Sequence, residues 1–365
     1  MAFTSYRNVR PWAKAIQLAV QTRTMPPWHA APHYGKFSND SRMHDSEIEA
    51  IVVWAKNGAP EGNAKDLPPL PQFAEGWRIG KPDAVYSIAE YTLGSNTLGS
   101  GGNEEQATFY VDTNLKEDVW AEAVEILPGN RKVVHHAIVW LEAGQDAAFV
   151  RTVAPEIDDG CSHPAAGEVG SILASYVPGK GPEQWPVGIA KRIPAGARLK
   201  FTISYSKSAG EDEKDMTSVG LRLAKRKPEQ ELRRIDLHNT TFLIPANAES
   251  HAVTACHTLI EDADVLSYLV HMRYRGKSIQ IEAKYPDGRR EILIAIPRYD
   301  FQWQTKYLNA TPVRIPKGTR IELKATFDNS PNNRNNPDPS RQIQWGEGAA
   351  DERMDGWIEF VTPKR

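Results

Sequence analysis

The sequence lacks the features that mark several common functional classes. Its 44 Lys and Arg residues are balanced by 46 Asp and Glu residues, so no net field attracts nucleic acid or an anionic membrane. No apolar run approaches the roughly 20 residues that a membrane-spanning helix needs. We therefore expect a small or neutral partner, no nucleic acid and no membrane span.

Cysteine is equally scarce. The chain holds only Cys161 and Cys256, and it contains no Cys-x-x-Cys-His element. A structural zinc site takes four ligands, so two cysteines alone do not form one. Covalent attachment of haem c requires the missing element, which argues against haem in this chain. One disulfide between the two cysteines and two buried thiols are both open.

The N-terminal residues show no basic stretch followed by an apolar core and a cleavage site, so no secretory signal is visible. A product that begins as written would stay in the cytoplasm. A chain that begins inside a longer, exported protein would look the same, and we expect a periplasmic or secreted location if the full-length precursor carries a signal.

The N-terminal region has a helical pattern. Apolar residues recur at helical spacing from Val9 to Gln21, and a second helix is expected from an N-cap at Ser46 to Lys56. A proline-rich stretch follows, which is stiff and extended. We predict a helical region over residues 1–66 and a linker over 67–80.

Beyond Lys81 the pattern changes to short β-branched or alternating runs between turn residues, which is typical of sandwiches and barrels. Pro286-Asp287-Gly288-Arg289 is expected to be a hairpin turn. We predict a mainly β fold of two consecutive antiparallel, jelly-roll-like β-sandwich domains, 81–224 and 225–365. The expected strands include residues 107–111, 133–141, 199–205, 219–223, 266–273, 279–285, 291–296, 320–327 and 356–361.

Two histidines, His135 and His136, are adjacent in a run that is apolar on both sides. Neighbours on a regular strand point to opposite faces, so both rings reach one metal only at a strand end or an irregularity. Two buried, hydrogen-bonded histidines are the simpler interpretation. His271 and Met354, taken alone, are likewise a strand histidine and core filler.

Several longer motifs occur in a fixed order. They include His271-Met272-Arg273-Tyr274-Arg275-Gly276-Lys277, Tyr285-Pro286-Asp287-Gly288, Pro297-Arg298-Tyr299-Asp300-Phe301-Gln302-Trp303-Gln304, Pro316-Lys317-Gly318-Thr319 and Val134-His135-His136-Ala137-Ile138-Val139. Together they resemble the copper type II, ascorbate-dependent monooxygenases related to peptidylglycine and dopamine β-monooxygenase, in the bacterial branch where these domains follow a c-type cytochrome. The resemblance spans essentially the whole chain.

The resemblance implies up to two coppers, each held by one β-sandwich, that face each other across a solvent-filled cleft. One is bound by three histidines and passes electrons; the other is bound by two histidines and a methionine and activates dioxygen. His135 and His136 match two ligands of the first site. His271 and Met354 match two ligands of the second, where the hydroxylation would take place.

Two positions depart from the family pattern. Ser204 stands where the third histidine of the first site is expected, and Arg273 stands where the second site has the other histidine of a His-x-His pair. A guanidinium has no lone pair to offer a metal. The substitute ligands to consider by proximity are His163, His251 and His257.

The resemblance therefore leaves three functions open. The first is a copper-dependent monooxygenase that uses dioxygen and an external donor, such as ascorbate or a cytochrome, to hydroxylate a small-molecule or peptide substrate. The second is an altered metal or ligand binder, in which Ser204 and Arg273 line a site for an anionic or polar ligand. The third is a structural remnant.

The N-terminal region has its own resemblance. Thr24-Met25-Pro26-Pro27-Trp28 and the segments that follow are similar to the distal half of a class I cytochrome c, which implies Met25 as the axial ligand if haem is present. Since no Cys-x-x-Cys-His element exists here, the haem-attachment half would lie upstream of Met1.

Overall fold

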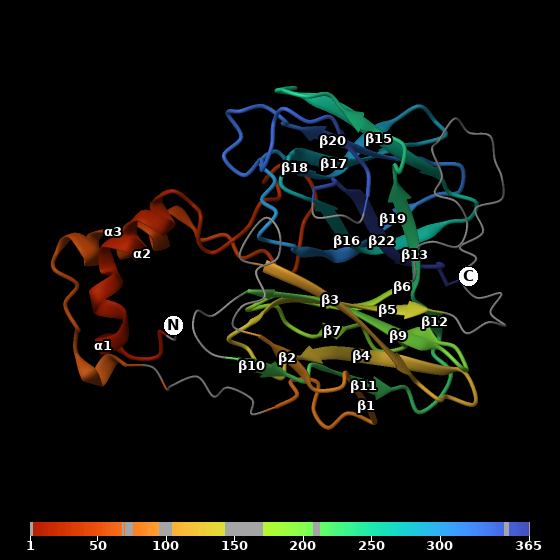
Figure 1. Ribbon diagram of the computed structural model, residues 1–365, viewed down its shortest axis with the longest axis horizontal. Coiled ribbons are helices and arrows are strands. Elements are labelled where there is room, and N and C mark those ends of the chain that lie inside the picture. The colour runs from red at the N-terminus through yellow and green to blue at the C-terminus, as the bar shows by residue number, and fades with distance from the viewer. Residues whose placement is uncertain are drawn as a thin grey trace.

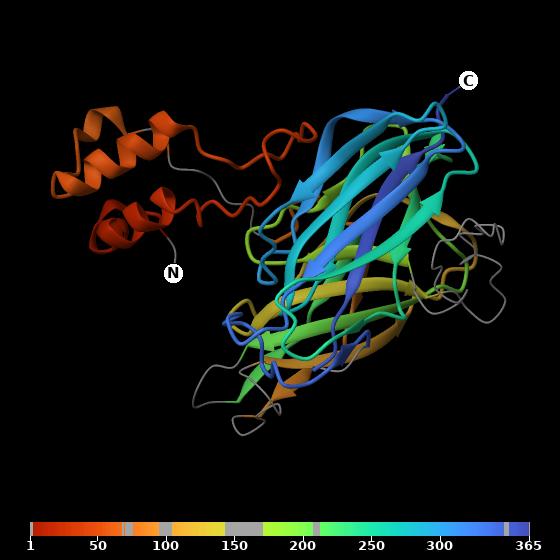
Figure 2. The ribbon, with the colours of Figure 1, turned by 90° about the horizontal axis from the view of Figure 1, so that it is seen from above.

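The computed structural model describes residues 3–67, 69, 76–94, 104–142, 171–206, 212–346 and 350–364. The chain is mainly β, with a small helical region at its N-terminal end. In both ribbon views this helical region stands to one side of the β body (Figures 1 and 2). Half of the predicted linker, residues 68 and 70–75, lies outside the described residues.

Short helices make up the N-terminal region, and α2 packs against α3. The second helix begins one residue before the expected N-cap Ser46, because the backbone N–H of His44 donates to the Glu47 carboxylate at 2.7 Å and closes the first turn there. The helical elements are α1 (Tyr6–Val9), η1 (Arg10–Trp12), α2 (Ala13–Gln21), α3 (Asp45–Lys56) and η2 (Ala64–Asp66).

The first β unit consists of the strands up to residue 231. One large sheet has the order β1-β11-β4-β8-β12, with β7 beside β4, and the other has the order β3-β9-β5-β6. Residues from both sheets form one hydrophobic core. The strands are β1 (Ala84–Ser87), β2 (Tyr91–Leu93), β3 (Glu104–Asp112), β4 (Val119–Leu127), β5 (Val134–Glu142), β6 (Ser171–Tyr176), β7 (Glu183–Gln184), β8 (Ile189–Ile193), β9 (Arg198–Ser206), β10 (Glu213–Asp215), β11 (Ser218–Leu223) and β12 (Gln230–Glu231).

The second β unit comprises the strands from residue 233 onward. Its large sheets have the orders β13-β22-β16-β19 and β15-β20-β17-β18, and a second hydrophobic core draws on both. The strands are β13 (Arg233–His238), β14 (Leu243–Ile244), β15 (His251–Thr258), β16 (Ala263–Met272), β17 (Gly276–Lys284), β18 (Arg290–Ile296), β19 (Lys306–Ile315), β20 (Arg320–Phe327), β21 (Ile343–Gln344) and β22 (Met354–Val361).

All nine strands predicted from the sequence pattern occur in the structure, within a few residues of their expected ends. The hairpin at residues 286–289 joins β17 to β18, and Gly288 adopts the positive φ of 86° that the turn requires. The passage between the units lies later than expected, because β12 pairs with β8 and so belongs to the first unit.

The two units meet through the sheet of β5 and the sheet of β22. Trp140 on β5 contacts Trp357 on β22, with ring centroids 6.3 Å apart. Lys191 on β8 lies 3.3 Å from Glu359, and Lys306 on β19 lies 2.6 Å from Glu183. The contact between the units therefore combines buried ion pairs with apolar packing.

Residues 28–39, which were assigned to the helical region, pack on the second β unit. Phe37 forms an isolated β-bridge with Asn309, and the ring of Trp28 lies 5.0 Å from that of Tyr307. Ala30 is part of the second core. The segment thereby ties the helices to the β body.

Candidate metal centre

His135 and His136 lie at the start of β5, where the pairing with β9 is irregular. The register shifts between Val134 and His136, as it does at a β-bulge. A bulge removes the strict alternation of side chains, so two consecutive residues can face the same space. This is the irregularity that a shared metal would require.

The two imidazoles use this irregularity to approach each other. Their Nδ1 atoms are 3.3 Å apart and their ring planes make an angle of 69°. Two nitrogens bound at about 2.0 Å to one tetrahedral ion lie about 3.3 Å apart. The spacing therefore fits two ligands of one metal ion, and it equally suits an N–H of one ring donating to the other.

Ser204 on β9 stands beside this pair but does not extend it. Its Oγ lies 2.9 Å from Nε2 of His136, the ring nitrogen opposite the Nδ1 pair. When Nε2–H donates to Ser204, the lone pair of Nδ1 is left for a metal. Ser204, which stands where the family has its third histidine, thus supports His136 instead of serving as a third nitrogen ligand.

Burial keeps the rings of His136 and His271 neutral. Burial lowers the pKa of His136 to about 4, and the positive charges of His135 and Arg273 lower it further. Burial also lowers the pKa of His271 to about 3, although Asp355 opposes this effect. Neutral imidazole is the form that binds a metal ion.

His271 reaches the interface from the second β unit. It is the penultimate residue of β16 and lies directly opposite Asp355 of β22. The charge of His136 lowers the pKa of His271, and that of Arg273 lowers the pKa of His136. His271 and Arg273 of the second unit are therefore close enough to His136 of the first to interact with it electrostatically.

Met354, which the family resemblance pairs with His271, lies on the other face of the sheet. Met354 pairs with Met272, and both side chains are fully buried in the second core. His271 pairs with Asp355 one residue further along, and neighbouring residues of a strand point to opposite faces. The sheet itself separates the thioether of Met354 from the imidazole of His271.

His238 on β13 was not identified from the sequence. It lies opposite Asp355 on the other side of β22, and its Nδ1 is 2.7 Å from a carboxylate oxygen of Asp355. The other carboxylate oxygen accepts from Nε of Arg353 at 2.9 Å. His238 ends a strand of alternating pattern, and only the pairing of β13 with β22 brings it to this site.

The remaining candidates lie elsewhere. His251 and His257 are on β15, in the sheet on the far side of the second core from β16. His163 and Cys161 lie outside the described residues, whereas Cys256 is disulfide-bonded. Met25 follows α2 and is 47% exposed.

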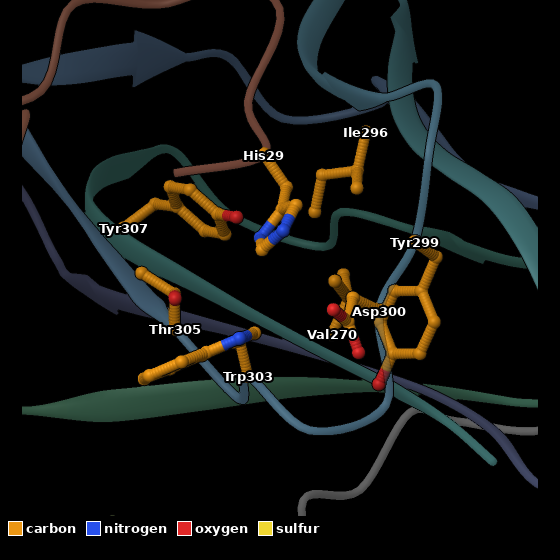
Figure 3. Close-up of a pocket in the computed structure, with 8 residues that line it drawn as sticks. All are labelled: His29, Val270, Ile296, Tyr299, Asp300, Trp303, Thr305 and Tyr307. Atoms are coloured by element: carbon orange, nitrogen blue, oxygen red, sulfur yellow. The ribbon is translucent and has the colours of Figure 1, made fainter. Parts of the chain in front are cut away.

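A small pocket lies between residue 29 and the second β unit (Figure 3). Its side chains leave no room for a water molecule, so it is a packing defect and not a ligand site. One of its residues matters for the metal centre: the Tyr299 hydroxyl accepts from the backbone N–H of Met272 at 2.9 Å and donates to its carbonyl oxygen at 3.0 Å. These bonds hold the end of β16 on which His271 lies.

As the side chains stand, no three His, Cys, Asp or Glu residues in the described part of the chain are placed to hold a metal ion together. The same residues include no helix long and apolar enough to cross a membrane. The candidate centre is therefore the two-nitrogen pair of His135 and His136.

Comparison with known proteins adds little to this geometry. No family model matches the chain, and no curated protein matches it. Among solved structures, the VP2 subviral particle of infectious bursal disease virus and the Gx strain of that virus each share 10% identity, cover 77% of this chain and 73% of the other, and have a TM-score of 0.21.

Proposed function

We propose that this chain is a copper-binding oxidoreductase on the framework of the copper type II, ascorbate-dependent monooxygenases. Its copper is held by Nδ1 of His135 and Nδ1 of His136. The observation that carries the proposal is the 3.3 Å spacing of these two atoms at the bulge of β5. In this proposal the two β units are consecutive β-sandwich domains, and the helical region is part of a cytochrome.

Imidazole suits a copper that alternates between Cu(II) and Cu(I), so a copper here would exchange single electrons with an external donor such as ascorbate or a cytochrome. The chain's own residues set the conditions for that exchange. Ser204 fixes the orientation and tautomer of His136, and burial keeps the ring uncharged. The packing of Trp140 on Trp357 limits the access of water from this side.

Hydroxylation of a small-molecule or peptide substrate with dioxygen is the further activity that the resemblance implies. In the family it depends on the second copper, whose expected ligands His271 and Met354 point to opposite faces here. This observation favours the second candidate function, an altered metal or ligand binder without hydroxylase activity.

An exported, periplasmic or secreted location completes the proposal. Cys256 is disulfide-bonded in the structure, and disulfides persist mainly in oxidising compartments. Identification of the mature N-terminus in the native source tests it. A mature chain that begins at Met1 in the cytoplasm would contradict it.

Copper analysis of the purified chain tests the central proposal. We expect one copper per chain after loading and desalting, with nitrogen hyperfine structure in the electron paramagnetic resonance spectrum of the Cu(II) form. His135→Ala and His136→Ala should each lose this copper, whereas His257→Ala, on the remote strand β15, should keep it. A wild-type chain that binds no copper refutes the proposal.

A further inference from the structure

The interface side of β22 determines what the second β unit can bind. Ile358 and Phe360 share the second core with Met354, so the alternate residues of the strand face the first unit. Trp357 contacts Trp140 and Glu359 contacts Lys191, which places these residues on the interface. Asp355 belongs to the same series.

Arg353 lies two residues before Asp355, so it is the next residue in the set of alternate residues that face the first unit. It is 7% exposed, and its Nε donates to Asp355 at 2.9 Å, so its side chain lies on the Asp355 side of the sheet. The guanidinium also stacks over the ring of Trp345 at 4.9 Å. Arg353, which immediately precedes β22 on the Asp355 side of the sheet, is therefore held by an acid and an aromatic ring.

The donor atoms on this face do not suit copper. Arg273 and Arg353 have no lone pair and carry fixed positive charge. Asp355 is occupied on one oxygen by His238 and on the other by Arg353. Both methionines of the segment, Met272 and Met354, point into the core, so neither places its thioether beside the imidazole of His271.

We infer that the second β unit binds no copper, and that Arg353 occupies the interface position from which a ligand on β22 would have to act. A buried network of Arg353, Asp355 and His238 takes the place of a metal-binding site. His271 lies beside this network as a neutral side chain. The inference concerns the second unit alone and does not depend on copper at His135 and His136.

The first test removes candidate ligands from the full-length chain. Copper is counted by elemental analysis after anaerobic loading with Cu(I) and desalting, and thermal unfolding confirms that each variant is folded. We expect His271→Ala and Met354→Ile to bind as much copper as the wild type. A wild-type chain with two coppers, or the loss of one copper in either variant, would overturn the inference.

The second test rebuilds the site in the His135→Ala, His136→Ala background, where copper at the first unit is abolished. Arg273→His together with Arg353→Met supplies a His-x-His pair and a thioether on one face. We expect this combination to gain one copper with a sulfur ligand in X-ray absorption. Arg273→His alone, which keeps the native Met354, should show no copper–sulfur signal.

Each outcome of the rebuilding experiment decides the question. A copper–sulfur signal with Arg273→His alone would mean that Met354 reaches the interface, and this overturns the inference. If the Arg273→His, Arg353→Met variant folds but gains no copper, Arg353 does not occupy the interface position from which a ligand would act. A wild-type chain without copper would refute the proposed function and leave the inference on the second unit intact.

Discussion

At the scale of single residues, Ser204 decides which nitrogen of His136 is available. Its Oγ lies 2.9 Å from Nε2, and when Nε2–H donates to this hydroxyl, the lone pair of Nδ1 is left to bind a metal. Loss of a supporting partner of this kind typically weakens metal binding about 10- to 100-fold. We predict that Ser204→Ala weakens copper binding by about tenfold, measured by competition with a Cu(I) chelator.

Thr202→Ala is the matched control for this prediction. Thr202 lies two residues earlier on β9 and opposite Ile138, away from both imidazoles. It should leave the affinity unchanged. Equal affinities in Ser204→Ala and the wild type would show that Ser204 does not orient His136.

Arg273 acts on the same centre through its charge. It lowers the pKa of His136 because a positive charge disfavours a second one nearby, and it should disfavour Cu(II) relative to Cu(I) for the same reason. We predict that Arg273→Gln lowers the reduction potential of copper at His135 and His136, measured by redox titration. Lys277→Gln, at an exposed position of β17, is the control, and an unchanged potential in Arg273→Gln would contradict the prediction.

At the scale of elements, the sequence predicted where the strands lie, but it did not always predict which face of the sheet a given side chain occupies. The alternating pattern located β16 and β22, yet the family resemblance placed His271 and Met354 together. Only the register, with His271 opposite Asp355 and Met272 opposite Met354, shows that they diverge. The bulge at His135 was likewise a condition that sequence could state but not establish, since it depends on how β5 pairs with β9.

The core role of Met354 leads to a stability prediction. Its side chain is fully buried among residues of the second core. Truncating a buried methionine to alanine typically costs about 2 to 5 kcal/mol, because contacts are lost and a cavity remains. We predict a loss of about 3 kcal/mol for Met354→Ala in urea unfolding; a loss below that of an exposed substitution such as Met216→Ala would contradict the core assignment.

The sheet of β15, β20, β17 and β18 carries charged pairs that respond to pH. Hydrogen bonds from Arg290 and Lys324 lower the pKa of Glu282 to about 2, from a usual value of 4.5. A carboxylate with a depressed pKa stabilises the folded chain above its usual pKa, and this contribution is lost as pH falls from about 4.5 to about 2.

We therefore predict that Glu282→Gln destabilises the chain by about 1 kcal/mol at pH 7, since Arg290 and Lys324 are partly exposed and screened. The difference from the wild type should vanish near pH 2. Urea unfolding measured across this range tests the prediction, and a difference that persists unchanged at the lowest pH would contradict it.

At the scale of the whole molecule, the two β units are joined by charges that the sequence gives no means of pairing. Glu183 and Lys306 are separated by 123 positions, and Lys191 and Glu359 by 168, yet these four residues meet in one buried cluster. Composition showed only that opposite charges balance. Which charges become buried together depends on how β7 and β8 of the first unit dock on the sheet of β22.

This cluster should hold the metal centre and the face of His271 in a fixed relation. Glu359 accepts from Lys191 at 3.3 Å, from Lys306 at 2.6 Å and from the hydroxyl of Ser267 at 3.0 Å. Burial by itself would raise the pKa of Glu183, but Lys180 and Lys306 outweigh burial and lower it to about 2. Glu183, Glu359 and Lys306 are therefore charged at neutral pH, whereas burial lowers the pKa of Lys191.

Removing one charge from such a cluster leaves its partners buried without compensation, which typically costs about 3 to 5 kcal/mol. We predict that Glu359→Gln, which keeps the size of the side chain but not its charge, destabilises the chain by about 3 kcal/mol and loosens the docking of the two units. Urea unfolding measures the first effect, and the maximum dimension from small-angle X-ray scattering measures the second. Glu229→Gln removes an exposed glutamate and serves as the control. If Glu359→Gln behaves like this control, the units are held together by the packing of Trp140 on Trp357 and not by the charges beside it.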